Sequence, residues 1–123
     1  MLDFRKFGRS LRFAWKGIAT LARQEQSFRI QLVVALAVLG AIAVLDLQRS
    51  ETALLLVVTT SVLVLELLNS AVERLVDLFT PRIHRYAEEI KDLMAGAVLV
   101  SSIGALLVGV LVFWPHVAAL LNR

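Results

Sequence analysis

The sequence predicts an all-α membrane protein, in which an amphipathic surface helix is followed by three transmembrane helices. The first observation is composition: mean hydropathy is +0.78, and 59% of the 123 residues are hydrophobic while 19% are charged. That is too apolar for a soluble domain of this size. The second is that seven of the thirteen basic residues lie before residue 30. The third is that long uncharged apolar stretches follow, so we expect one membrane domain over residues 1–123.

Residues 1–29 are predicted to form a surface helix and a joint. Over residues 2–23, the apolar face carries Phe4, Phe7, Leu11, Ala14, Trp15, Ile18 and Ala22. The opposite face carries Arg5, Arg9, Arg12, Lys16 and Arg23. This pattern is typical of a helix that lies on a membrane with its basic side chains towards anionic headgroups. The expected partner is therefore a membrane and not a nucleic acid, with a soluble partner protein as the alternative. Residues 23–29 are expected to be a polar joint, with Glu25 as its only acid.

The first two spans are expected at residues 30–47 and 51–79, separated by a short loop over residues 46–52. Eighteen apolar residues are just long enough to cross a bilayer. The second helix, about 43 Å long at 1.5 Å per residue, exceeds the hydrocarbon thickness, so we expect it to extend into the cytoplasm. Pro81 predicts its end, because proline disfavours helical geometry in the residue before it.

The third span is expected at residues 93–114, after a polar loop over residues 82–92, and Pro115 is expected to close it. Every fourth residue along this span is small, which would let another helix approach closely: Ala97, Ser101, Ala105 and Gly109. Trp114 fits an interfacial aromatic belt.

The charge distribution predicts the orientation. Basic residues are concentrated in the N-terminal segment and in residues 80–92, whereas the loop at 46–52 and the C-terminal tail hold one each. The positive-inside rule then places the N-terminus in the cytoplasm and the C-terminus outside. We expect a multi-pass protein of the inner (cytoplasmic) membrane, with its polar site on the cytoplasmic side.

Polar positions in the second span recur at intervals of three, four and four residues, at Glu66, Asn69, Glu73 and Asp77. At about 100° per residue they share one stripe. An intramembrane charge costs roughly 2.5 kcal/mol or more, so the stripe should face a bundle interior or a wet cavity. Glu66 is expected well inside the membrane, where a carboxylate suits a general base.

Other groups on the cytoplasmic side suit phosphate chemistry. Lys91 and Asp92 directly precede the third span, and a lysine there can reach a phosphate. Glu25 and Glu73 could hold Mg²⁺, which prefers oxygen ligands. Together these groups favour phosphoryl transfer from a nucleotide to a membrane alcohol, although neither G-x-x-x-x-G-K-[ST] nor G-x-G-x-x-G occurs.

Two other interpretations of the stripe remain open. It could be a hydrogen-bonded seam that holds an oligomer together, or it could line a small cation or proton channel. The channel does not explain why Glu25, Lys91 and Asp92 gather on one side with a basic loop. With no cysteine in the chain, disulfides, thiolate metal ligands and thiol nucleophiles are excluded.

The segment Glu66-Leu-Leu-Asn-Ser-Ala-Val-Glu73, with Asp77, Lys91-Asp92 and Ala95-Gly96-Ala97-Val98, resembles the prokaryotic diacylglycerol kinase family, which includes undecaprenol kinases. The resemblance implies a homotrimer with sites shared between subunits, and MgATP as phosphate donor. It implies that Glu66 is the catalytic base and that Glu25 and Glu73 bind the metal and nucleotide. Further nucleotide contacts would be Asn69, Asp77, His84, Lys91 and Asp92. Candidate substrate contacts, besides Glu66, are Lys6, Arg9 and Trp15.

The chain departs from the family pattern at Glu89 and Ile90, and His84 alone would also suit an ordinary loop histidine. The acceptor expected from the family name is diacylglycerol, which would become phosphatidic acid. The alternative acceptor is undecaprenol, which would become undecaprenyl phosphate.

Overall fold

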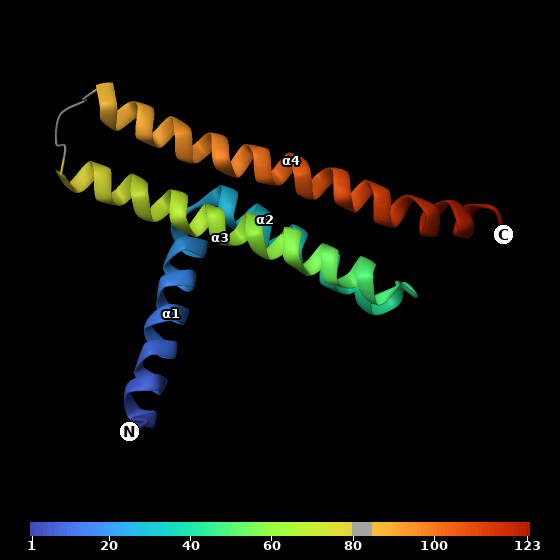
Figure 1. Cartoon of the computed structure of the whole chain (residues 1–123), viewed down its shortest axis with the longest axis horizontal. Helices are drawn as coiled ribbons and strands as arrows, with labels where there is room; N and C mark the ends of the chain where they lie inside the picture. The colour runs from blue at the N-terminus through green and yellow to red at the C-terminus, as the bar shows by residue number, and fades with distance from the viewer. Residues whose placement is uncertain (80–84) are drawn as a thin grey trace.

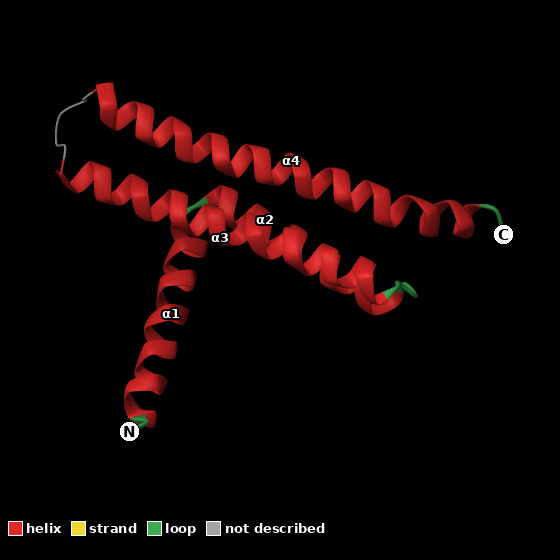
Figure 2. Ribbon diagram, viewed as in Figure 1, coloured by secondary structure: helices red, strands yellow, loops and turns green. Residues whose placement is uncertain are grey.

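A computed structural model describes residues 1–79 and 85–123 of the chain. That part consists of the helices α1 (Phe4–Gln24), α2 (Gln26–Val44), α3 (Arg49–Phe79) and α4 (Arg85–Leu121), and Figure 2 shows no strand in it. Three of the helices, α2, α3 and α4, are long and apolar enough to cross a membrane. The predicted all-helical chain with three helices capable of spanning a bilayer is therefore confirmed.

The three long helices form a bundle from which α1 projects as an arm (Figure 1). Helices α3 and α4 run antiparallel and side by side, and α2 packs against α3. The small residues of α4 face this packing, because all are half-buried and all line cavities that α3 also lines: Ala97, Ser101, Ala105 and Gly109. The larger Leu99 and Leu106 on other sides of α4 are exposed.

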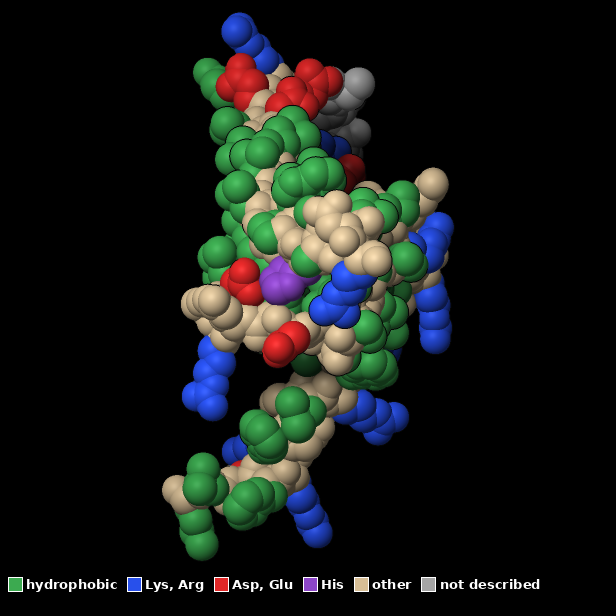
Figure 3. Space-filling model, turned by 90° about the vertical axis from the view of Figure 1, so that its right-hand side faces the viewer, with side chains coloured by type: hydrophobic (Ala, Val, Ile, Leu, Met, Phe, Trp, Pro, Cys, Tyr) green, Lys and Arg blue, Asp and Glu red, His purple; other side chains and the backbone are tan. Residues whose placement is uncertain are grey.

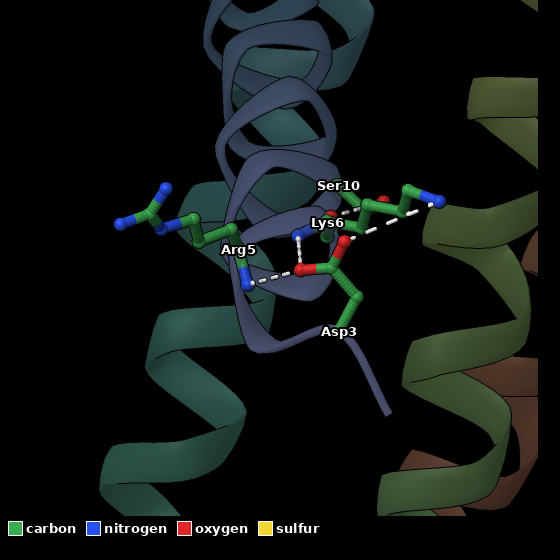
Figure 4. A network of polar contacts seen from close by, with 4 residues as sticks. All are labelled: Asp3, Arg5, Lys6 and Ser10. Atoms are coloured by element: carbon green, nitrogen blue, oxygen red, sulfur yellow. Dashed lines mark hydrogen bonds and ion pairs between the residues drawn. The ribbon is translucent and has the colours of Figure 1, made fainter. Parts of the chain in front are cut away.

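Helix α1 begins at a capping aspartate. Asp3 has extended backbone geometry, and its Oδ1 accepts hydrogen bonds from the backbone nitrogens of Arg5 (3.1 Å) and Lys6 (3.2 Å) (Figure 4). Such a cap satisfies backbone donors that have no partner within the helix.

The expected polar joint over residues 23–29 is reduced to a single residue. Glu25 is extended (φ −109°, ψ 118°), whereas Gln24 ends α1 and Gln26 begins α2. The expectation of a seven-residue joint is wrong because glutamine and arginine continue a helix readily. Arg29 Nη1 donates to the carbonyl oxygens of Ala22 (3.2 Å) and Arg23 (2.9 Å), so it satisfies the last acceptors of α1.

Helix α3 begins two residues before the expected position. The backbone nitrogen of Gln48 donates to Glu51 Oε2 at 2.9 Å, and that of Thr52 donates to Gln48 O at 3.0 Å. Because Glu51 reaches back to the first turn as in a capping box, the helix starts at Arg49. Helix α2 ends at Val44, three residues before the expected position, so the turn lies at residues 45–48.

Helix α4 is longer at both ends than the expected third span. Residues 85–92 are helical, so the expectation of a loop there is wrong, while Thr80, Pro81 and residues 82–84 lie outside the described residues. An Arg85–Glu89 pair at 3.3 Å, one helical turn apart, supports the first turns. Pro115 lies inside the helix, which continues to Leu121, because a proline removes one backbone hydrogen bond without having to end a membrane helix.

Candidate active site

Glu66 is the most deeply placed acid of the predicted stripe. It is only 5% exposed, and its Oε1 accepts a hydrogen bond from Ser27 Oγ at 2.5 Å. Ser27 belongs to the first turn of α2, so two helices meet at this carboxylate. The expectation that Glu66 faces the bundle interior is confirmed.

The contact with Ser27 also fixes the height of Glu66 along the bundle. The sequence predicted that Glu66 lies well inside the membrane. Its partner, however, lies in the first turn of α2, at the end that the charge pattern places at the cytoplasmic surface. Glu66 is therefore level with the first turn of α2, and its depth in a membrane stays a prediction.

The remaining stripe residues become more exposed towards the end of α3. Asn69 is half-buried, and Glu73 and Asp77 are exposed. Within one chain, the acid at one end of the stripe, Glu66, is therefore buried beside α2, whereas the acids at the other end, Glu73 and Asp77, are exposed beside α4. Of the expected environments, a bundle interior or a wet cavity, the interior is observed for Glu66 and in part for Asn69, and a wet cavity around Glu73 and Asp77 stays a prediction.

Lys91 of α4 bridges to the end of the stripe. Its ammonium donates a short hydrogen bond to Asp77 Oδ1. Lys91 precedes the expected third span, and its pKa is raised, because Asp77 accepts this bond and because Asp77, Glu73 and Glu88 attract the positive charge. The side chain is therefore charged at neutral pH and lies among carboxylates on the predicted nucleotide side.

The two expected metal ligands lie on elements that contact each other. Arg74 Nη2 donates to Gln24 Oε1 at 2.7 Å, so the residues adjacent to Glu73 and Glu25 are joined. Glu25 is half-buried and Glu73 is exposed. In residues 1–79 and 85–123, no group of three His, Asp or Glu side chains is arranged to hold a metal ion.

Two further predicted nucleotide contacts lie on the α4 side of the site. Asp92 is exposed and lines an open groove of about 970 Å³ together with Leu65 of α3 and Ser101. His84 lies outside the described residues.

The predicted substrate contacts on α1 are not brought to Glu66 in a single chain. Lys6 Nζ lies 4.0 Å from Asp3 Oδ2 at the start of α1, the end of the arm that is far from the bundle (Figure 4, Figure 1). Arg9 is exposed and Trp15 is 73% exposed. Figure 3 shows Lys and Arg side chains projecting from this arm beside hydrophobic ones, so the α1 contacts stay predictions.

An apolar cavity of about 650 Å³ begins close to Glu66 and is lined by α2, α3 and α4. Leu63, one turn before Glu66, and Gln31, one turn after Ser27, line it together with residues as distant as Trp114. The Oε1 atom of Gln31 is buried and has no hydrogen-bond partner among the described residues. The cavity therefore offers a mainly hydrocarbon surface that reaches to within one helical turn of the buried carboxylate.

The sequence patterns do not predict the contacts of Ser27 and Arg74 in the site. They place Ser27 within an expected polar joint. Ser27 and Gln31 are, however, four residues apart and share one face of an apolar helix. That spacing was a usable signal for a polar contact with the acidic stripe. No sequence pattern indicated the bond from Arg74 to Gln24, because it depends on the angle between α1 and α3.

Comparisons with known proteins show which family the chain belongs to. The family model described as "Prokaryotic diacylglycerol kinase" matches residues 12–113. The chain is 36% identical over 113 residues to a diacylglycerol kinase of Synechocystis sp., covering 91% of this chain but 65% of that protein. It is 34% identical to the undecaprenol kinase of Bacillus subtilis, covering 92% of both chains, and 30% identical to the diacylglycerol kinase of Escherichia coli K12, covering 85% of both. The chain therefore belongs to the prokaryotic diacylglycerol kinase family, and the names of the family and of these relatives indicate a lipid kinase.

Proposed function

We propose that this protein transfers the γ-phosphoryl group of ATP to the hydroxyl of a membrane lipid, with diacylglycerol as acceptor and phosphatidic acid as product. The observation that carries the proposal is the position of Glu66: a buried carboxylate that is bonded to the first turn of α2 and lies one helical turn from residues that line an apolar cavity. A lipid whose chains lie in apolar surroundings can present its hydroxyl at this height. The charged pair formed by Asp77 of α3 and Lys91 of α4 lies further along the bundle, on the side expected to meet nucleotide.

In the proposed reaction, Glu66 accepts the proton of the lipid hydroxyl while that oxygen attacks the γ-phosphorus of ATP. The new oxygen–phosphorus bond forms as the bond to the bridging oxygen of ADP breaks, and ADP leaves. Lys91 supplies positive charge to the phosphates, with Asn69, Asp77, His84 and Asp92 as further nucleotide contacts. Such a reaction depends mainly on positioning and charge stabilisation.

Glu25 and Glu73 are the residues that would hold Mg²⁺ in this proposal. Carboxylate oxygens suit this ion, which usually takes few protein ligands and shares the phosphates of its substrate. The bond between Arg74 and Gln24 supports the pairing, because it brings together the elements that carry the two acids. When bound, Mg²⁺ would neutralise charge on the transferred phosphoryl group.

The choice of lipid is tested by offering labelled ATP with diacylglycerol and undecaprenol in parallel. The relatives carry both names, so undecaprenol kinase activity is the second candidate. We expect phosphatidic acid as the main product. Preferential formation of undecaprenyl phosphate would instead assign the chain to the second activity.

The proposal includes the assembly and orientation that the family resemblance and the charge pattern imply. The chain forms a homotrimer in the inner membrane, with its N-terminus and active site facing the cytoplasm. Helix α1 lies on the membrane surface, where Lys6, Arg9 and Trp15 contact lipid. Light scattering of the detergent-solubilised protein measures the subunit number directly, and a monomer would contradict the assembly.

The central prediction concerns Glu66→Gln. We expect lipid phosphorylation to fall by at least about a hundredfold, because a positioned general base contributes on that order, while the assembly stays intact. Asp46→Asn, an exposed acid in the α2–α3 turn, is the matched control and should keep wild-type activity.

The same variant distinguishes the two rival interpretations. Loss of assembly with undiminished phosphorylation would favour a structural seam. Cation flux through reconstituted wild-type protein without nucleotide, abolished by Glu66→Gln and with no phosphorylated lipid formed, would favour a channel.

A further inference from the structure

The Oγ of Ser27 donates a hydrogen bond to Glu66 Oε1 at 2.5 Å, although the two residues are 39 positions apart in the sequence. We propose that Ser27 is a positioning residue, which orients the carboxylate of Glu66 for the reacting lipid hydroxyl. The inference rests on the proposed function, in which Glu66 is the catalytic base. Ser27 itself touches neither substrate nor nucleotide in this assignment.

A hydroxyl donor is suited to orienting a general base. The terminal torsion of a glutamate side chain is broad and roughly two-fold, so packing alone leaves the plane of the carboxylate poorly defined. An ionised carboxylate only accepts hydrogen bonds, and one donor on Oε1 fixes its plane and directs Oε2 to the incoming hydroxyl. A neutral donor does this without placing a cation on the base.

The backbone around Ser27 is held on both sides. The next residue, Phe28, is 1% exposed, and the side chain of Arg29 binds two carbonyl oxygens at the end of α1. The backbone nitrogen of Arg29 also donates to Glu25 O at 3.2 Å. Ser27 is therefore fixed relative to both helices that meet at the joint.

The hydroxyl of Ser27 is also not used for capping its own helix. Serine near a helix start commonly binds a free backbone donor, and the N-cap of α2, Glu25, makes no side-chain hydrogen bond to the helix. Ser27 nevertheless turns to α3. Both proposed functional acids are therefore positioned at the first turn of α2: Glu25 is its N-cap, and Glu66 accepts the hydrogen bond from Ser27.

The test uses the full chain in mixed lipid–detergent micelles and compares Ser27→Ala with Ser27→Thr, which keeps a hydroxyl. Ser61→Ala is the matched control, because Ser61 is also a serine of the bundle but its hydroxyl donates to Val57 O within its own helix, at 2.8 Å. We expect Ser27→Ala to lower kcat about tenfold, the rate equivalent of one lost hydrogen bond. The KM for MgATP should stay unchanged, and Ser27→Thr should recover most of the loss.

A spectroscopic measurement separates this inference from the kinase assignment. Infrared difference spectra against Glu66→Gln identify the carboxyl stretching band of Glu66, and we expect this band to move in Ser27→Ala, to return in Ser27→Thr, and to stay in place in Ser61→Ala. A band unmoved by Ser27→Ala would overturn the positioning role, whatever the kinase assay gives. A moved band with wild-type kcat would overturn it too. A moved band in a protein that phosphorylates neither lipid would leave the orienting contact standing and refute the proposed function.

Discussion

Two acids of α3 have different partners, and the partner determines what each can do. Asp77 is paired with the ammonium of Lys91, so its charge is already compensated within the chain. Among the described residues, the hydrogen-bond partner of Glu66 is the neutral hydroxyl of Ser27, and Glu66 itself is 5% exposed. A base needs a carboxylate that is not paired with a cation, and Glu66 meets this condition whereas Asp77 does not.

At the level of single residues, the metal assignment gives a second prediction. Glu25→Gln and Glu73→Gln should each raise the KM for MgATP at least about tenfold, because an amide binds Mg²⁺ less well than a carboxylate. The KM for lipid should change little, and added Mg²⁺ should restore part of the lost rate. Asp46→Asn again serves as control. An unchanged ATP dependence in both variants would count against the metal role.

The acids of the site could be predicted from the sequence, whereas the groups that hold them could not. Spacing alone places Glu66 and Glu73 on one stripe, because helical geometry converts sequence intervals into angles. Ser27 reaches Glu66 only because α2 packs against α3 in one particular register. Such a register depends on contacts between residues far apart in the sequence, which leave no periodic signal in it.

At the level of the helices, apolar periodicity predicted each helix but misplaced its ends. Helix α4 extends beyond the expected span at both termini, and its N-terminal extension forms because charged residues such as Glu88 are good helix formers. Helix α3 starts where Glu51 caps it. Helix ends depend on individual side-chain contacts, while helix centres depend on the sum of many residues.

Pro115 gives a prediction at this level. Because α4 continues through it, Pro115→Ala should restore one backbone hydrogen bond and stabilise the protein by up to about 3 kcal/mol. Thermal unfolding followed by circular dichroism should show a higher Tm, with unchanged kinase activity. Gly104→Ala is the comparison in the same helix, since its added methyl group would meet nothing within 4 Å and should gain no more than about 1 kcal/mol. A lower Tm for Pro115→Ala would mean that the bundle needs the proline.

For the whole molecule, the absence of cysteine makes the orientation directly measurable. Ser10 on α1 and Asn122 at the C-terminus are both exposed, so each can be replaced singly by cysteine. A membrane-impermeant maleimide should label Ser10→Cys only from the cytoplasmic side and Asn122→Cys only from the outside, as the positive-inside rule requires. The cysteine-free parent protein is the control. Labelling of both variants from one side would contradict an odd number of spans.

One extended residue, Glu25, is all that separates α1 from α2, and the connection therefore has no slack. Because α2 is packed against α3, a single residue inserted after Glu25 would displace α1 relative to the bundle and break the bonds from Arg29 to the last carbonyl oxygens of α1. A substitution in this stretch alters one side chain, but a change of length alters the position of the whole of α1. The length of the chain between α1 and the bundle is therefore constrained, and insertions or deletions there should be tolerated far less well than replacements.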